Sequence, residues 1–340
     1  MLTSLPGPAP GTVRRTLSLE VTPDPEWSAG LRITALGRDT RTSTTDNGEL
    51  LRSVTMSVTI DAASRITGFQ SDLPAVVTGQ LTGAGAISGF RAKLADLDEL
   101  DQSSLESAVL DELPTVRLIS GYAQMIELTG VTGTAELQPH RDRRSPPVGI
   151  CAGWAPGATA DTRARAGIPV VTGTPAAQAL ASMTPYFHAE PDPRPRSMRR
   201  RRILDVTARG GGYEVYEYFR DSHFDADLRE GALHEYEVHA RAAADEGCTL
   251  ERIDVVPHAL PFGECPLAAP NAADLAGASL RVITGTVKER LSGTRSCTHL
   301  NDTLRFLRYV PALLPPGGDS PYARWNEELR VTRKAGNSGS

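Results

Sequence analysis

Two cysteines and a histidine toward the C-terminal end of the sequence have the residue types and spacing of a metal site. Cys265 lies in a Gly-Glu-Cys-Pro segment, and Cys297 and His299 lie in a later Ser-Cys-Thr-His-Leu segment. Two thiolates and an imidazole can together bind a soft or borderline metal such as zinc. The alternative is that both cysteines are buried small apolar residues and that His299 is a capping residue.

The spacing around Cys297 predicts that this residue stands at the start of a helix. Apolar residues repeat at i, i+4 and i+7, the intervals of one helix face, at Leu300, Leu304 and Leu307. A helix that begins near Thr298 directs unpaired N–H groups and the positive end of its dipole toward Cys297. This surrounding favours the thiolate over the thiol, and a thiolate is the form that binds metals.

The composition indicates a globular protein and argues against two classes of partner. The chain has 340 residues, 40% hydrophobic and 23% charged, which is long enough for two domains. Its net charge of −5 argues against a nucleic-acid-binding protein, which would carry a basic domain. The sequence has no run of about 18 apolar residues and no apolar core near its N-terminus, so we expect no membrane span and no signal peptide. Four unevenly spaced cysteines do not predict a disulfide framework, which favours a cytoplasmic protein.

The first half of the chain reads as strands followed by helices. Residues 1–12 are rich in proline and glycine and are predicted to be disordered, and residues 13–137 form the first predicted unit. Within that unit, apolar residues alternate strictly with Thr and Ser over residues 54–60, which is typical of a strand with one buried face. The other predicted strands of this unit cover residues 13–20, 31–35 and 65–69. Helices are predicted over residues 78–98 and 103–125.

Residues 138–198 are predicted to be a linker. The segment is dense in proline and glycine, has weak hydrophobic periodicity, and is flanked by basic runs at Arg141–Arg144 and Arg199–Arg202. We expect it to lie across a domain surface, anchored by Cys151 and by a buried Trp154. A structureless segment of this length inside one compact domain would be unusual, so it indicates a domain boundary.

Residues 199–325 repeat the plan of the first unit and are followed by a flexible tail at 326–340. Similar residues recur at a nearly constant offset in residue number. The offset is 186 between Arg15 and Arg201, 187 between Pro74 and Pro261, and 188 between Gly89 and Gly277. Such offsets predict an internal repeat. The expected fold is therefore an internally duplicated α+β protein, a pseudo-dimer in which each half is an antiparallel sheet of about four strands flanked by helices.

Comparison of the two predicted halves distinguishes residues needed for the fold from residues that could have a function. At an offset of 187, Cys265 corresponds to Thr78, Cys297 to Leu110 and His299 to Glu112. The first half therefore lacks the candidate ligands and is a degenerate copy. Because two halves of one architecture do not both need these residues in order to fold, we expect a functional site in the second half only.

Several segments of the second half resemble an uncharacterised family, domain of unknown function 2889. They are FRDSH, GALHEYEV, LPFGECPLAA and TRSCTHLNDTL, and the resemblance covers residues 199–310. The resemblance implies that the polar residues shared with the family are those at His234, Glu235, Cys265, Cys297, Thr298 and His299. The family supplies no established activity.

A remoter similarity is to the iron–sulfur scaffold fold of the NifU and SufU type, a short antiparallel sheet followed by helices. The resemblance implies that His234, Cys265 and Cys297 take the three ligand positions in chain order. This sequence has a histidine where the scaffold has its first cysteine. That departure favours a mononuclear metal, most simply zinc, over an iron–sulfur cluster.

The residues and the resemblances together predict a metal-dependent enzyme of small-molecule metabolism, lyase or hydrolase in type. The predicted metal ligands are His234, Cys265 and Cys297, and the predicted catalytic residues are Glu235, Glu264 and His299. His223 and His258 are weaker candidates that could line the same cleft. The alternatives are an iron–sulfur or sulfur-transfer scaffold and a structural protein with inert cysteines. The substrate and the oligomeric state are not predicted.

Overall fold

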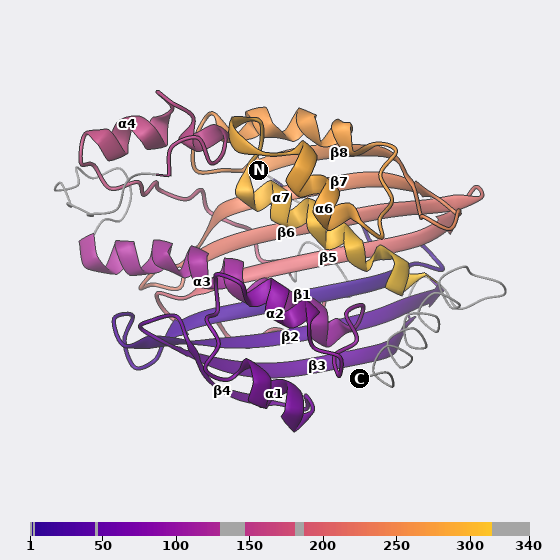
Figure 1. Ribbon diagram of the computed structural model, residues 1–340, viewed down its shortest axis with the longest axis horizontal. Helices are drawn as coiled ribbons and strands as arrows, with labels where there is room; N and C mark the ends of the chain where they lie inside the picture. Colours follow the sequence, from indigo (N-terminus) through magenta and orange to yellow (C-terminus); the bar gives the residue numbers. More distant parts are fainter. Residues whose placement is uncertain (1, 3, 45–46, 130–146, 181–186, 315–340) are drawn as a thin grey trace, which may run out of the picture.

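The structure, a computed structural model, describes residues 2, 4–44, 47–129, 147–180 and 187–314. Its centre is one eight-stranded antiparallel sheet with the order β4-β3-β2-β1-β5-β6-β7-β8 (Figure 1). The strands of the first half are β1 (Val13–Pro23), β2 (Gly30–Thr44), β3 (Asn47–Asp61) and β4 (Ile66–Ser71). Those of the second half are β5 (Met198–Arg209), β6 (Gly212–Phe224), β7 (Glu230–Ala243) and β8 (Leu250–Ala259).

The two sets of four strands join where β1 pairs with β5. Each set is a meander in which strands consecutive in sequence are neighbours in the sheet. The expected number of about four strands in each half is therefore correct, but all eight strands form one sheet rather than two.

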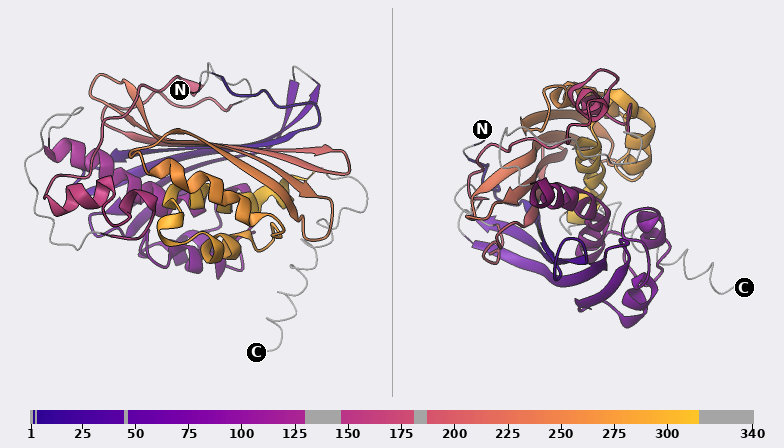
Figure 2. Two further views of the ribbon diagram at one scale, coloured as in Figure 1. Left: turned by 90° about the horizontal axis from the view of Figure 1, so that it is seen from above. Right: turned by 90° about the vertical axis from the view of Figure 1, so that its left-hand side faces the viewer.

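The helices pack against one face of this sheet (Figure 2). Those of the first half are α1 (Ala75–Leu81), α2 (Phe90–Ala95) and α3 (Leu105–Thr129), so the single helix expected over 78–98 is interrupted. The segment between the halves contains η1 (Ala152–Trp154) and α4 (Thr159–Arg165). The second half contributes η2 (Cys265–Leu275), α6 (Ile283–Arg290), η3 (Gly293–Arg295), α7 (Thr298–Phe306) and η4 (Leu307–Leu313).

Strand alternation divides the side chains of the sheet between the two faces. On the helix face, apolar residues such as Leu17, Leu204 and Val238 join the buried side chains of α3 and α7 in one core. On the opposite face, Leu5 and Leu180 pack on Ile203 and Tyr218 in a smaller cluster. Segments from outside the sheet therefore cover both faces of its centre.

The second basic run, Arg199–Arg202, does not flank a linker but lies buried in the central strand β5. Arg200 and Arg202 both bind Glu112 of α3 and Asp302 of α7 on the helix face. A buried guanidinium needs carboxylate partners, and these acids supply them. The first run, Arg141–Arg144, and the tail at 326–340 lie outside the described residues.

No helix within the described ranges is long and apolar enough to cross a membrane.

Candidate functional site

Three side chains from β6, β7 and α7 meet on the helix face of the sheet. Asp221 of β6 and His234 of β7 are partners in the antiparallel register, which places their side chains on the same face. His299 is the second residue of α7. One nitrogen or oxygen atom from each of the three lies within 4.8 Å of the others. This is the one group of three or more His, Cys, Asp or Glu residues at such spacing in the described part of the chain.

The contacts inside this group leave one buried polar atom unsatisfied. The rings of His234 and His299 stack with their centroids 3.4 Å apart and their planes at 19°. Nδ1 of His234 lies 3.3 Å from Oδ2 of Asp221, yet neither this contact nor another described residue gives it a well-directed hydrogen bond. A buried polar atom in this state calls for a partner such as a water or an ion.

Arg200 holds Asp221 in its ionised form. The guanidinium donates to both carboxylate oxygens, over 2.7 Å from Nε and 2.9 Å from Nη2. Burial opposes ionisation of Asp221, but the charge of Arg200 and the contact with His234 outweigh it, so the pKa of this carboxyl is lowered. The site therefore contains a permanent carboxylate next to two imidazoles.

Cys297 lies beside His299 at the start of α7. It is the residue that immediately precedes the helix, as the sequence predicts, and it is 3% exposed. Burial raises the pKa of the thiol, but donors around the sulfur reverse that effect and bring the pKa to about 7. These donors are the His299 side chain, the hydroxyl of Tyr236 at 3.3 Å and the backbone N–H of Leu300. The thiolate is accordingly accessible near neutral pH.

Cys265 has a different environment. Its thiol is buried, and burial raises its pKa to about 12, with the nearby Cys297 adding to the shift. His234, Cys265 and Cys297 are not among the described residues whose ligand atoms all lie within 4.8 Å of one another. The structure thus brings together His234 and His299 of the predicted residues, with Cys297 adjacent, and leaves the ligand role of Cys265 as a prediction.

Glu235 lies on the wrong face of the sheet for a role beside His234. Adjacent strand residues point to opposite faces, and Glu235 accepts hydrogen bonds from Tyr218 at 2.6 Å and from Arg220 at 2.6 and 2.8 Å on the far side. This carboxylate is part of a buried structural pair. The prediction that Glu235 acts at the same site as His234 overlooked the alternation.

Glu264 binds a neighbouring helix. Its Oε1 accepts from the backbone N–H of Thr159 at 3.0 Å and from the Thr159 hydroxyl at 2.9 Å, at the first residue of α4. Burial raises the pKa of Glu264, but these hydrogen bonds outweigh it and lower the pKa. A carboxylate at a helix start is a stabilising cap. This position gives Glu264 a structural role, while its Oε2 has no hydrogen-bond partner among the described residues and its catalytic role stays a prediction.

The segment between the halves packs beside the cysteines. The N–H of Ala152 donates to the carbonyl of Ser296 at 2.8 Å, and Cys151 is buried. A Cβ on Gly153 would lie 3.1 Å from Sγ of Cys265, so a larger residue there would require the thiol to shift by a few tenths of an ångström. Trp154 is only partly buried, so the expectation that Trp154 is the buried anchor is corrected in favour of Cys151 and Gly153.

The sequence reading missed Asp221. This residue stands in the FRDSH segment, one position after Arg220, and nothing in its local spacing marks it as a ligand. Its partnership with His234 depends on the strand register, which has a bulge directly after Asp221. A prediction that FRDSH and GALHEYEV form adjacent strands would have been the signal that places Asp221 beside His234.

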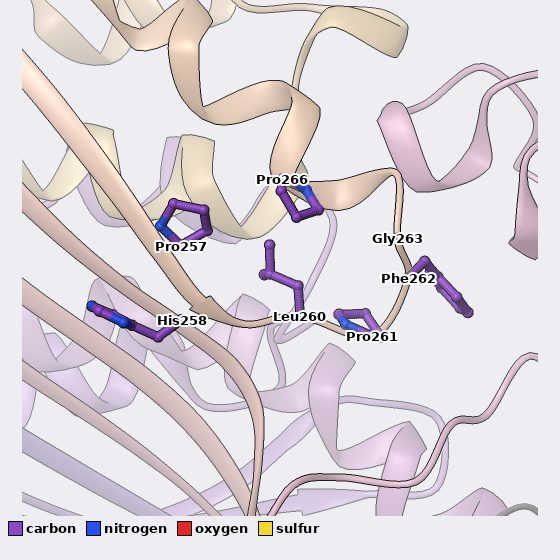
Figure 3. A pocket seen from close by; sticks show the side chains of 7 residues that line it. All are labelled: Pro257, His258, Leu260, Pro261, Phe262, Gly263 and Pro266. Atoms are coloured by element: carbon purple, nitrogen blue, oxygen red, sulfur yellow. The ribbon is translucent and has the colours of Figure 1, made fainter. Parts of the chain in front are cut away.

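A pocket of about 280 Å³ lies apart from this group, at the end of β8 (Figure 3). The side chains of Pro257, Leu260 and Pro266 converge there, whereas the imidazole of His258 points away from them. Nε2 of His258 instead lies 2.6 Å from Oε2 of Glu237. His258 therefore does not line the same site as His234.

Residues 198–312 match the family model described as Protein of unknown function (DUF2889). This match confirms the resemblance of most of the second half of the chain to that family. The match contains all the residues of the Asp221, His234 and His299 group, together with Cys265 and Cys297. No curated protein and no solved structure matches the chain, so the similarity to the NifU and SufU scaffold has no support from these comparisons.

Proposed function

We propose that the protein is a metal-dependent enzyme of small-molecule metabolism, lyase or hydrolase in type, with Asp221, His234 and His299 as the metal ligands. One observation carries the proposal: a carboxylate and two imidazoles from three separate elements have ligand atoms within 4.8 Å of one another. This ligand set differs from the one predicted from sequence, because Asp221 and His299 replace the two cysteines.

The donor types fit a divalent metal, and the stacked rings of His234 and His299 would have to turn for both lone pairs to point at one ion. Two histidines and one carboxylate form a donor set used for catalytic zinc and for non-haem iron, in both cases with an open coordination position. The unsatisfied Nδ1 of His234 supplies a lone pair in its neutral form, and Arg200 fixes the carboxylate of Asp221 from the other side. Zinc is the metal we propose, with iron as the alternative.

The chain's own residues would then divide the work. A zinc ion held in this way supplies Lewis acidity toward a substrate oxygen. Cys297 is next to His299 and has a pKa of about 7, so it can hold or release a proton during the reaction. Tyr236 and the N–H of Leu300 keep its sulfur in place. This assignment gives Cys297 the proton-transfer role that the sequence analysis gave to Glu235 and Glu264.

Metal analysis of the purified protein tests the proposal. We expect about one zinc or iron ion per chain in the wild type, and a loss of most of that metal in His234→Ala and His299→Ala. Cys297→Ala should keep its metal, because Cys297 is proposed to move a proton and not to ligate. His239→Ala is the matched control, since His239 is an exposed histidine on the opposite face of β7.

Equal metal content in the wild type and in folded His234→Ala would refute the proposed site. Loss of metal in Cys297→Ala alone would instead support the ligand set predicted from the sequence. Circular dichroism of each variant separates a lost ligand from a lost fold.

A thiol-dependent enzyme is the second candidate function, and the environment of Cys297 favours it. A cysteine at a helix start, with an imidazole and a hydroxyl directed at its sulfur, is typical of nucleophilic thiolates. Under this function the protein needs no metal, and activity is lost in Cys297→Ser.

An iron–sulfur or sulfur-transfer scaffold has less support. Such a site requires several thiolates at ligand spacing, and burial keeps Cys265 and Cys151 protonated at neutral pH by raising their pKa values. Acid-labile sulfide in protein purified without oxygen would revive this alternative. A purely structural role would be supported by a protein without metal and without a titratable thiol.

We also propose that the two halves derive from one duplicated unit. In each half, the first residue of the edge strand exchanges two backbone hydrogen bonds with a turn that contains a glycine of positive φ. In the first half these are Ile66 and Gly83, and in the second half Leu250 and Gly277. The equivalent of Gly277 is therefore Gly83. The sequence offset had suggested Gly89 instead. Superposition of the two halves in an experimental structure would test this origin.

A further inference from the structure

The first half of the chain repeats the arginine–carboxylate pair that underlies the proposed metal site. In the second half, Arg200 donates to both carboxylate oxygens of Asp221 through Nε and Nη2, at 2.7 and 2.9 Å. In the first half, Arg15 donates to both oxygens of Asp39 through the same two nitrogens, at 2.8 Å each. Each arginine also stands opposite its aspartate in the sheet, in β1 and β2 and again in β5 and β6. The two pairs therefore occupy equivalent places in the two halves.

A β-bulge follows each of these aspartates. The register of β2 against β3 shifts directly after Asp39, and that of β6 against β7 shifts directly after Asp221. Each shift skips one residue of the partner strand, which is a leucine in both halves. Directly opposite the two aspartates stand Arg52 on β3 and His234 on β7. Arg52 is therefore the counterpart of His234.

The second residue of a helix completes the arrangement in both halves. Glu106 is the second residue of α3, and His299 is the second residue of α7. Arg52 donates to Oε1 of Glu106 at 3.1 Å from Nε and at 2.6 Å from Nη2. The ring of His234 stacks on that of His299 with the centroids 3.4 Å apart. Glu106 is therefore the counterpart of His299, where the sequence offset had suggested Glu112.

The residue directly before each helix is a third position at which the two halves differ. Ser104 stands before α3, and its hydroxyl accepts a hydrogen bond from the N–H of Ser107 at 3.0 Å. Cys297 stands at the same place before α7. A serine hydroxyl is an ordinary helix cap. Because it is sufficient at the start of α3, the fold does not require a thiol at the equivalent Cys297.

We infer that the first half contains a closed counterpart of the candidate site, in which the guanidinium of Arg52 fills the position of a divalent cation. The inference rests on the proposed function, because the metal site of the second half is its template. A guanidinium is a cation that binds carboxylates, so it can take the place of a metal beside Glu106 and Asp39. The hydrogen bonds and the charge of Glu106, together with the charge of Asp39, raise the pKa of Arg52 against the effect of burial.

The comparison distinguishes the framework of the site from the residues that decide what it binds. The arginine–aspartate pair, the bulge and the helix start are common to both halves, so they belong to the fold. Arg52 and Glu106 in one half, and His234 and His299 in the other, are the residues that differ. The first pair supplies its own cation from a side chain that is 57% exposed, whereas two imidazoles leave room for an ion from solution.

Zinc titration of the full chain, after removal of bound metal, tests the inference. The double variant Arg52→His/Glu106→His keeps Arg15 and Asp39 and replaces the ion pair by two imidazoles. It should bind one zinc ion per chain more than the wild type, with Asp39 as the third ligand. Because Arg15 fixes that carboxylate, the added ion should bind about tenfold more tightly than any zinc bound by a pair of histidines outside the framework.

The matched control is Arg295→His/Asp274→His, because this exposed pair has the same 2.6 Å contact and lies outside the framework. Circular dichroism confirms the fold of each variant. Absence of the added ion in the folded double variant overturns the inference whatever the wild type binds, and so does an equally tight added ion in the control.

The zinc content of the wild type tests the proposed function separately. A wild type without zinc and an Arg52→His/Glu106→His variant with one ion would refute the proposed metal function and keep the inference. One ion in both proteins would keep the proposed function and overturn the inference.

Discussion

At the scale of residues, the chemistry of the site depends on donors gathered around one sulfur and one carboxylate. Cys297 is at least as buried as Cys265, yet the pKa of Cys297 is lowered to about 7 and that of Cys265 is raised to about 12. The difference lies in their partners, since His299, Tyr236 and a helix N–H stabilise the thiolate of Cys297. Burial alone would make both thiols inert.

The ultraviolet absorbance of the thiolate should follow this difference. In metal-free protein we expect a thiolate transition with a midpoint near pH 7, present above that pH and absent below it. Tyr236→Phe removes a donor to the thiolate and should move the midpoint upward, because hydrogen bonds to a charged form lower its pKa. Cys297→Ser should abolish the transition, while Cys265→Ser should leave it. A transition that survives Cys297→Ser would assign the acidic thiol to another cysteine.

At the scale of elements, the ends and irregularities of strands and helices position the residues of the candidate site and the turns at the sheet edges. The start of α7 places Cys297 and His299 over β7, and the bulge after Asp221 sets the register of β6 against β7. The turns that hold the edge strands β4 and β8 are alike in both halves. Each uses a glycine with φ near +80°, Gly83 at 82° and Gly277 at 81°.

Alanine substitution of these two glycines should have equal effects. A residue with a Cβ is strained at such a φ, so Gly83→Ala and Gly277→Ala should each destabilise the protein by about 1 kcal/mol. Nothing lies within 4 Å of a Cβ added at either glycine, so backbone strain is the only term. Gly285→Ala, inside helix α6 and equally uncrowded, should instead stabilise by roughly 0.5–1 kcal/mol. Urea unfolding measures all three, and clearly unequal costs for Gly83 and Gly277 would speak against equivalent turns.

At the scale of the whole molecule, buried ion pairs join the two halves across the centre of the sheet. Asp302 of α7 accepts from four arginines over 2.7–3.0 Å, and it is 5% exposed. One of them, Arg91, belongs to α2 of the first half, and the others are Arg200, Arg202 and Arg305. Although burial alone would raise it, the pKa of Asp302 is lowered well below its ordinary value because these cations surround it. Neither half therefore completes its own charge balance.

Asp302→Asn should cost about 3 kcal/mol of unfolding free energy, since it removes the shared partner of buried cations. The effect should depend on pH. A carboxyl whose folded pKa is lowered contributes stability above its unfolded pKa of about 4 and loses it as the pH falls. The variant should therefore show a shallower loss of stability below about pH 4 than the wild type. Asp274→Asn, in an exposed pair with Arg295, should change stability by less than about 1 kcal/mol. A similar effect of both substitutions would mean that the buried network adds no special stability.

The sequence by itself determined the strand pattern and the helix start at Thr298, because each depends on neighbours within a few residues. The lowered pKa of Cys297 depends in addition on Tyr236, which is distant in the sequence. Alternating Val, Thr and Ser make a strand with one buried face wherever they occur, and the first turn of a helix always presents unpaired N–H groups. Only the tertiary structure decided which of these residues meet. Asp221 is the partner of His234 because of the register of β6 and β7, and Glu264 binds the start of α4. The opposite face of Glu235, by contrast, follows from strand alternation and could have been predicted from the sequence. Register and packing between distant segments depend on the sum of many weak contacts, and no local spacing contains that sum.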